Sequence, residues 1–149
     1  MKLVIQRVAF AKVEIDGAVF SDIKGGLLVL VGVDVNDEEK DAKWLAAKTA
    51  CLRIFNDADG VMNKSVTDID GEILAVSQFT LLASAKKGNR PSYIRAARPE
   101  KAKPLYELYS DELERLIGKR VKRGCFGADM KVSLLNDGPV TILIDSRAD

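Results

Sequence analysis

The chain has 149 residues, 47% of them hydrophobic and 30% charged, a composition that predicts one folded domain over residues 1–149 and excludes a disordered or fibrous protein. It has no histidine, which excludes a Ser-His-Asp relay and a histidine-ligated metal site within one chain. The net charge of +1 hides an asymmetry, because residues 34–72 carry 10 acidic and 5 basic side chains whereas residues 73–123 carry 12 basic and 5 acidic ones, so the second segment is either a phosphate-binding surface or ordinary solvated charge.

The N-terminal part of the chain predicts strands. Apolar residues alternate with polar ones around Leu3 and again around Val13, and Asp16-Gly17 is a dipeptide typical of a tight hairpin turn. Gly25-Gly26 then precedes Leu27 to Val33, a nearly continuous aliphatic run. Such a run is typical of a strand in the interior of a sheet.

A helix is predicted over about residues 37–55. Asn36 or Asp37 can cap it, and Glu39 stands three residues after Asn36 as in a capping box. Its expected buried face repeats at helical spacing and consists of Ala42, Leu45, Ala46, Thr49, Leu52 and Phe55.

The middle of the chain predicts a strand, a loop and a second helix. Glu72 to Leu82 is rich in Ile, Val, Phe and Leu, which favours a strand. Residues 84–99 contain glycine, prolines and much of the basic charge, so we expect a loop there with a short helix around residues 92–97. The second main helix follows Pro99 or Glu100 and ends at Gly118.

Three further strands are expected at residues 121–125, 130–135 and 140–145, the last two forming a hairpin whose turn contains Gly138-Pro139. Together these elements predict an α+β fold. A curved antiparallel or mixed sheet, or a barrel-like core, would pack against two main helices and a short third one.

The sequence lacks the usual signals of a membrane protein, a secreted protein and a metal-binding protein. The longest apolar run is far shorter than the roughly 20 residues of a membrane-spanning helix, and the N-terminus lacks a secretory segment, so we expect a cytoplasmic protein without membrane contact. Asp57, Asp59 and Asp68 do not follow the spacing of a calcium loop, and no metal is expected. Cys51 and Cys125 are expected to be free thiols, although Cys125 beside Arg123 remains an alternative nucleophile.

Two segments are unusual for a structural core. Ser77-Gln78-Phe79-Thr80 places three hydrogen-bonding side chains at the end of an apolar strand, which is costly in a core unless each finds a partner. Asn136 to Thr141 interrupts two aliphatic stretches with Asp-Gly-Pro. On physical grounds alone the second segment is a turn.

In combination, these segments resemble the D-aminoacyl-tRNA deacylase family, also called D-tyrosyl-tRNA deacylases. The resemblance extends over essentially the whole chain and is strongest at Ser77-Gln78-Phe79-Thr80 and Gly138-Pro139-Val140-Thr141, with support from the segments at residues 88–92 and 126–130. It implies hydrolysis of the ester that joins a D-amino acid, and also glycine, to tRNA, with exclusion of L-amino acids. It implies no cofactor, and an activated ester can be attacked by water without a histidine.

The resemblance also implies roles for individual residues. Thr80, Gln78 and Phe79 would be catalytic, through backbone amides or side-chain hydrogen bonds, with Thr80 orienting rather than attacking because no base is evident beside it. The substrate-binding residues would be Ser77, Gly138, Pro139, Arg7 and Met130. Gly138-Pro139, with its peptide isomer left open, would present a rigid carbonyl that blocks an L side chain, and Arg7 would fix that carbonyl.

The family is homodimeric, and the resemblance implies that Gly138-Pro139 of each subunit reaches into the site of its partner. Lys86, Lys87, Arg90 and the cluster at residues 119–123 would bind tRNA through its phosphates. Two alternatives remain open from the residues: a noncatalytic RNA-binding module, which explains the basic charge but not the paired motifs, and a hydrolase that uses Cys125.

Overall fold

The fold is organised around one long strand, β1 (Lys2–Ile15), which is paired along both edges in this computed structural model, described for residues 1–148. On one edge β1 pairs antiparallel with β3 (Gly26–Gly32) and then with β2 (Ala18–Ile23). On the other edge it pairs antiparallel with β8 (Lys131–Asp145). The tight turn at Asp16-Gly17 between β1 and β2 confirms the predicted hairpin.

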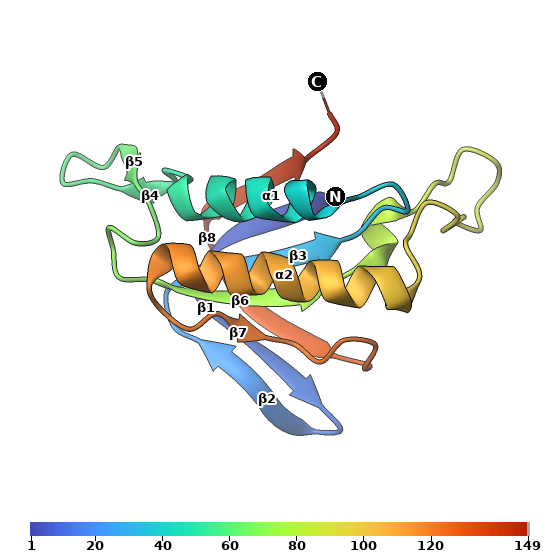
Figure 1. The fold of residues 1–149 in the computed structure, drawn as a ribbon. Helices are drawn as coiled ribbons and strands as arrows, with labels where there is room; N and C mark the ends of the chain where they lie inside the picture. The colour runs from blue at the N-terminus through green and yellow to red at the C-terminus, as the bar shows by residue number, and fades with distance from the viewer. Residues whose placement is uncertain (149) are drawn as a thin grey trace.

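The sheet continues with parallel strands beyond β3. β6 (Glu72–Ser77) pairs with β3, and the short β7 (Lys122–Arg123) pairs with β6, which gives the order β2-β1-β3-β6-β7 with β8 on the outer edge of β1. Figure 1 shows the strongly twisted sheet that results. The mixed, nearly closed sheet confirms the α+β prediction.

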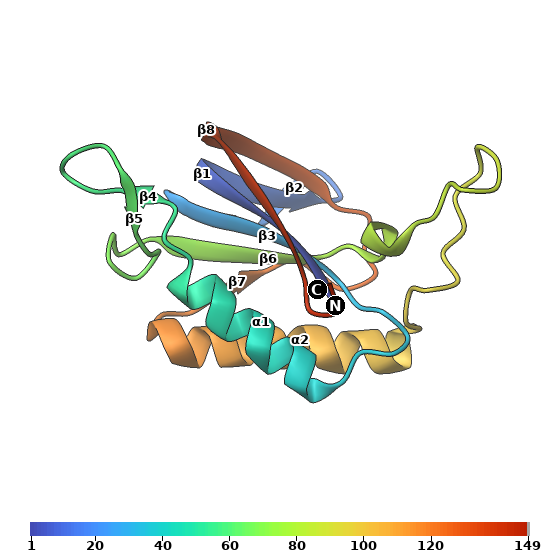
Figure 2. The same ribbon diagram turned by 90° about the horizontal axis from the view of Figure 1, so that it is seen from above.

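The two helices cover the same face of this sheet. Figure 2 shows α1 (Glu39–Cys51) and α2 (Pro99–Ile117) crossing beneath it. Alternation along β3 explains the layers, because Leu27, Val29 and Val31 belong to the core under the helices whereas Leu28 belongs to a second core on the opposite face. The described residues include no helix that is long and apolar enough to cross a membrane.

The start of α1 differs from the prediction. Its N-cap is Glu38, whose backbone N–H donates to Asp41 at 2.8 Å, and not Asn36 or Asp37. Asp37 is fully buried because it serves another contact: one carboxylate oxygen accepts from the Met1 ammonium at 2.5 Å and the other from the backbone N–H of Asp34 at 2.6 Å.

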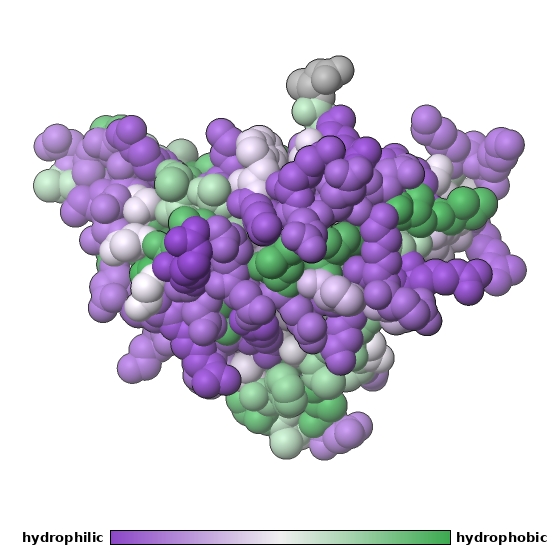
Figure 3. Space-filling view, viewed as in Figure 1, coloured by the Kyte–Doolittle hydropathy of each residue, from purple (hydrophilic) through white to green (hydrophobic). Residues whose placement is uncertain are grey.

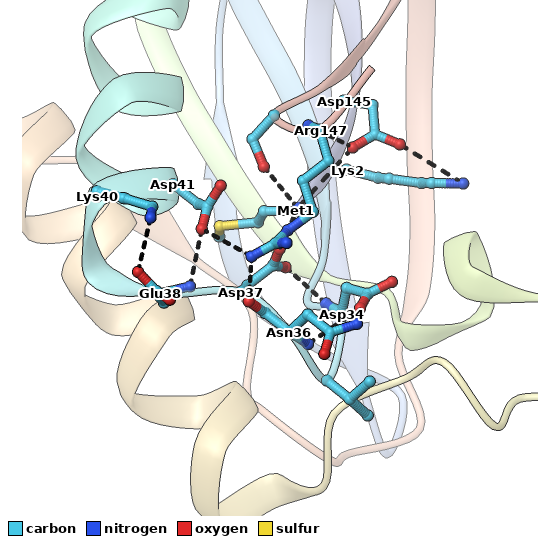
Figure 4. Close-up of polar contacts among 12 residues, drawn as sticks. Met1, Lys2, Asp34, Asn36, Asp37, Glu38, Lys40, Asp41, Asp145 and Arg147 are labelled. Atoms are coloured by element: carbon cyan, nitrogen blue, oxygen red, sulfur yellow. Dashed lines mark hydrogen bonds and ion pairs between the residues drawn. The ribbon is translucent and has the colours of Figure 1, made fainter. Parts of the chain in front are cut away.

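Figure 4 shows that this contact joins three distant parts of the chain. Arg147, near the C-terminus, donates to the same Asp37 oxygen at 3.2 Å and lies 3.6 Å from the Asp41 carboxylate on α1. The ammonium of Met1 also donates to Ser146 at 2.7 Å. The cluster therefore connects the start of β1 to α1 and to the residues that follow β8.

The predicted strand over residues 72–82 was too long. β6 ends at Ser77, and Phe79–Leu82 forms a turn of 3-10 helix, η1. The partner strand β3 ends at Gly32, and η1 folds over that glycine so closely that a Cβ on Gly32 would lie 2.7 Å from Leu82 Cδ2. β6 therefore ends next to the end of β3, because η1 turns across Gly32 and away from the sheet.

The short helix predicted around residues 92–97 was also wrong. Ser92 instead exchanges two backbone hydrogen bonds with Ser84, at 2.8 and 2.9 Å, and Ala97 N–H donates to Val33 at 2.9 Å. Because these amides bond across the loop, they are not available to a local helix. The third helical element of the chain is η1.

The hairpin predicted for residues 130–145 was wrong as well. β8 is one strand that pairs with β1 along both of its halves. Gln6 faces Thr141 and Val8 faces Asn136, so four residues of β8 lie opposite Arg7 alone. This wide bulge, residues 137–140, contains the Gly138-Pro139 peptide, which is cis, and Figure 2 shows β1 and β8 bending together at this corner.

A small second sheet lies beside that corner. It is formed by β4 (Phe55–Asn56) and β5 (Met62–Lys64). Asp57 organises the intervening turn by accepting from the backbone N–H groups of Asp59 and Val61 at 2.9 and 3.0 Å. These bonds, led by that of Val61, lower the pKa of Asp57. The acidic residues here act as turn formers, and within residues 1–148 no group of three metal-binding side chains is found.

Candidate functional site

A cavity of about 560 Å³ opens at the end of β6, where the polar motif of the sequence begins. Its walls come from the end of β6, from the start of α2 and from the segment between β7 and β8. Ser77, Gln78, Phe79 and Met130, four of the predicted site residues, all line it. The structure therefore brings together residues more than 50 positions apart in the sequence.

Beside the cavity, two backbone N–H groups of the Ser77–Thr80 segment have no partner among the turn and loop hydrogen bonds of the described chain. The backbone N–H of Gln78 makes the last sheet bond, to Val31 at 2.7 Å, and the bonds of η1 begin with Leu81 N–H donating to Gln78 at 3.3 Å. The amides of Phe79 and Thr80 therefore precede the first bond of the 3-10 turn. Two neighbouring N–H groups in this position can bind a developing negative charge.

Thr80 does not line the cavity itself but is linked to a residue that does. The side-chain amide of Gln78 donates to the Thr80 hydroxyl oxygen, so the threonine fixes the orientation of the glutamine. Within the described residues no imidazole or amine contacts Thr80 that could remove its proton. The arrangement suits an orienting role better than a nucleophilic one.

The sequence reasoning missed two aromatic residues of the cavity. Tyr106 from α2 and Phe126 lie in its wall with ring centroids 6.1 Å apart. Burial raises the pKa of Tyr106 to about 12, so its hydroxyl stays protonated and donates to the carbonyl of Ala75 at 2.8 Å. Phe126 belongs to the same motif as Met130, so the sequence could have predicted its place in the cavity. Tyr106 follows the helical spacing of an ordinary core residue, so no sequence signal pointed to a place for it there.

Gly138 and Pro139 lie outside this cavity. Their bulge lies opposite Arg7 of β1, which in turn pairs with Leu27 of β3. The cavity residue Ser77 pairs with Val31, four residues further along β3. Four residues of strand correspond to roughly 13 Å. Both ribbon views show the β8 corner on the left and η1 on the right.

The bulge is nevertheless firmly held. Arg7, only 8% exposed, donates from Nε to the carbonyl of Asp137 at 2.8 Å and from a terminal nitrogen to the carbonyl of Ile54 at 2.7 Å. The sequence had suggested a bond from Arg7 to the Gly-Pro carbonyl, but the acceptor in this chain is the carbonyl one residue earlier. Just before the bulge, Asn136 accepts from the backbone N–H of Val140 at 3.0 Å and donates to Thr141 at 3.0 Å.

The two basic clusters expected to bind tRNA are far apart. Lys86, Lys87 and Arg90 lie exposed in the loop before α2, beside η1. The other cluster follows the opposite end of α2, a helix of 19 residues and roughly 28 Å in length. There Lys119 pairs with Asp70 at 2.7 Å, and Arg123 pairs with Asp111 at 2.6 Å. The first cluster is exposed beside η1, whereas two members of the second, Lys119 and Arg123, are engaged in ion pairs.

Cys125, the alternative nucleophile, is exposed and is not among the residues that line the cavity. The carboxylate of the cavity wall, Asp129, pairs with Lys131 at 3.1 Å. Neither residue contacts the Ser77–Thr80 segment through a hydrogen bond or ion pair in the described chain. The chemistry of the cavity therefore centres on hydrogen-bond donors.

Comparison with known proteins identifies relatives along the whole chain. The model of a family described as D-Tyr-tRNA(Tyr) deacylase matches residues 4–145. A D-aminoacyl-tRNA deacylase of Akkermansia muciniphila is 60% identical over 99% of this chain and 98% of its own length. One from Flavobacterium psychrophilum is 58% identical over the same shares.

Solved structures agree with the fold. A c-Myc DNA unwinding element binding protein superposes with a TM-score of 0.92 at 41% identity, over 99% of this chain and 100% of the other. A probable eukaryotic D-amino acid tRNA deacylase superposes with a TM-score of 0.81 over 96% and 97% of the two chains. At 14% identity the second comparison concerns the fold alone.

Proposed function

The chain belongs to the D-Tyr-tRNA(Tyr) deacylase family and is a hydrolase that removes D-amino acids from tRNA; from this premise we propose that it cleaves the ester in the cavity at the end of β6 by direct attack of water. Ser77 and Gln78 hold the terminal adenosine and its ribose. Because its substrate is charged tRNA, the enzyme acts in the cytoplasm. No cofactor is required, because an aminoacyl ester is already activated.

The main contribution of the protein to the chemistry is the pair of amides at Phe79 and Thr80. They precede the first bond of η1, so they can donate to the oxygen of the ester carbonyl as it becomes negative. The neighbouring ribose hydroxyl of the RNA helps to activate the water. Thr80 orients Gln78 and takes no part in covalent chemistry.

Discrimination between D- and L-amino acids is assigned to the bulge of a second subunit. Gly138 and Pro139 are exposed and remote from the cavity of their own chain, while Arg7 and Asn136 hold their backbone in place. A fixed main-chain carbonyl facing the substrate Cα collides with an L side chain and leaves a D side chain free. The same backbone accepts from the amino group of the substrate, so productive binding of the D-ester also depends on the bulge. Glycine has no side chain to exclude, so glycine-charged tRNA is also hydrolysed.

A homodimer supplies that second subunit. The cross-strand partners Phe10 and Leu135 are 44% and 54% exposed, and Leu143 of the same strand is 75% exposed. Large apolar side chains along β8 and its partner strand β1, next to the exposed bulge, are typical of a surface that a second copy covers.

The observation that carries the proposal is that both family motifs are firmly built but separated in one chain, as expected for a site shared between two. The test measures amino acid release from tRNA charged with D-Tyr, L-Tyr or glycine. We expect turnover of the D-Tyr and glycine esters only. Equal rates for D-Tyr and L-Tyr would contradict the exclusion mechanism, and tight binding without release would favour the RNA-binding module.

The shared site is tested by mixing two variants of low activity, Thr80→Val and Gly138→Ala. The alanine is expected to disturb the bulge, because its Cβ would lie 2.9 Å from a terminal nitrogen of Arg7 and the backbone has φ +138°. In a mixed dimer one of the two sites combines an intact cavity with an intact bulge. Random exchange makes about half of the dimers mixed, so about a quarter of wild-type activity is restored. If each site were complete within one chain, mixing would restore nothing.

A further inference from the structure

We propose that Tyr93 and Ile94 form a stacking platform for the nucleotides that precede the terminal adenosine of the substrate, an inference that rests on the proposed function. Tyr93 is 40% exposed and Ile94 is 86% exposed, although large apolar side chains such as these are usually buried in a protein core. Figure 3 shows apolar surface, in green, on the side where this loop projects. Neither residue has been given a role by the motifs described above.

The platform continues directly from the cavity. The ring of Tyr93 meets that of Phe79 edge to face, with centroids 5.1 Å apart and planes at 70°. Phe79 is part of the cavity wall and is itself 57% exposed. An RNA end whose last nucleoside occupies the cavity can therefore leave it beside Phe79 and continue over Tyr93.

The loop that carries the platform is fixed on both sides. Ser84 and Ser92 exchange two backbone hydrogen bonds just before Tyr93. Just after Ile94, Arg95 pairs with the buried Asp34 at 2.7 Å, and its carbonyl accepts from Val35 N–H at 2.9 Å. Because these bonds exist before any ligand binds, stacking on Tyr93 requires little additional ordering of the chain.

The surrounding charge identifies the ligand as a single-stranded nucleic acid. Exposed cations flank the apolar pair, with Lys86, Lys87 and Arg90 on one side and Arg98 on the other. Proteins that bind single strands combine aromatic faces for bases with a basic surface for the phosphates. The end of a charged tRNA is such a strand and is already delivered to the adjacent cavity.

The experiment compares three D-tyrosyl esters that differ only in length: full tRNA, the trinucleotide CpCpA, and adenosine alone. For Tyr93→Ala, we expect KM to rise about tenfold with tRNA and the trinucleotide, as lost base stacking predicts, and to stay unchanged with adenosine. Tyr93→Phe keeps the ring and should behave as wild type. Ile94→Ser should raise KM in the same direction.

Two outcomes would overturn the inference. An equal loss on all three esters would mean that Tyr93 acts only by supporting Phe79, and an unchanged KM with tRNA would mean that no base rests on it. Failure of the proposed function gives a different result, since the wild-type protein would then release amino acid from none of the three esters.

Discussion

The guanidinium of Arg7 donates to the carbonyl of Asp137, 130 residues away in the sequence, at 2.8 Å. The same side chain donates to Ile54 beside β4, so the bulge in β8 and the small second sheet are held through one residue. A lysine presents one point charge in place of a planar fork and cannot reproduce both contacts.

Arg7→Lys is therefore expected to lower kcat/KM for D-aminoacyl-tRNA by about 10- to 100-fold, because the bulge loses its fixed position. It should also lower the free energy of unfolding by about 1–3 kcal/mol, since a buried carbonyl loses its donor. Arg53→Lys is the matched control, as Arg53 donates to Asn63 at the exposed surface of the second sheet. A fully active Arg7→Lys enzyme would contradict the role given to the bulge.

Thr80 can be tested by comparing two replacements. Thr80→Val removes the acceptor of the Gln78 side chain and should lower kcat, whereas Thr80→Ser keeps the hydroxyl and should retain most activity. Mass spectrometry of the wild-type enzyme during turnover should find no added aminoacyl group. An acyl-threonine would replace the water mechanism with a covalent one.

The basic loop beside η1 predicts salt-dependent substrate binding. Replacing Lys86, Lys87 and Arg90 by Gln should reduce the slope of log K against log salt by about two, at roughly 0.7 per cation removed on a single strand. Lys119→Gln serves as control, because Lys119 is paired with Asp70 at the far end of α2, and should leave the slope unchanged. If Lys119→Gln reduced the slope as much as the triple replacement did, the RNA would have to contact the far end of α2 as well as the loop beside η1.

Asp34 predicts a loss of stability in acid. Burial alone would raise its pKa, but the backbone bond from Asn36 and the contacts with Arg95 lower it overall. The folded state therefore binds this proton less readily than the unfolded state, so the stabilisation is present above pH of about 4 and is lost as the pH falls further. Denaturant unfolding at pH 6 and pH 3 should show a smaller difference for Asp34→Asn than for the wild type.

Tyr106 predicts the opposite behaviour in alkali. Burial raises its pKa to about 12, so the folded state retains a proton that the unfolded state loses above pH of about 10. Stability should then decrease as the pH rises from 10 to 12, by at most about 1.4 kcal/mol per unit from this group. Tyr106→Phe should be less stable at pH 8 by about 1 kcal/mol but should show a weaker dependence on alkaline pH.

The sequence predicted elements whose evidence is local. The turn at Asp16-Gly17 and the end of α2 at Gly118 depend on neighbouring residues and were placed correctly. The period of α1 was also correct, but the helix predicted to about residue 55 ends at Cys51, and Phe55 belongs to β4. Gly118 adopts φ +67° at the helix end, which is a conformation that glycine accepts readily. The N-cap of α1 was misplaced because Asp37 binds the Met1 ammonium, a partner that local patterns do not reveal.

Features that depend on distant pairing were missed. Residues 130–145 have the local pattern of a hairpin, and only their pairing with both halves of β1 makes them one bulged strand. The motif at Ser77–Thr80 was located, but its neighbours Tyr106 and Phe126 come from other elements. The cavity is a product of topology, which local periodicity does not encode.

The pairing of β1 with β8 has a consequence for how this enzyme is made. β1 is synthesised more than 100 residues before its partner, which spans residues 131–145, so one edge of β1 stays open until β8 has been made. Prematurely terminated chains cannot close the sheet and should be substrates for chaperones or proteases. A protein that corrects errors in translation thus becomes active only after its own β8 has been translated.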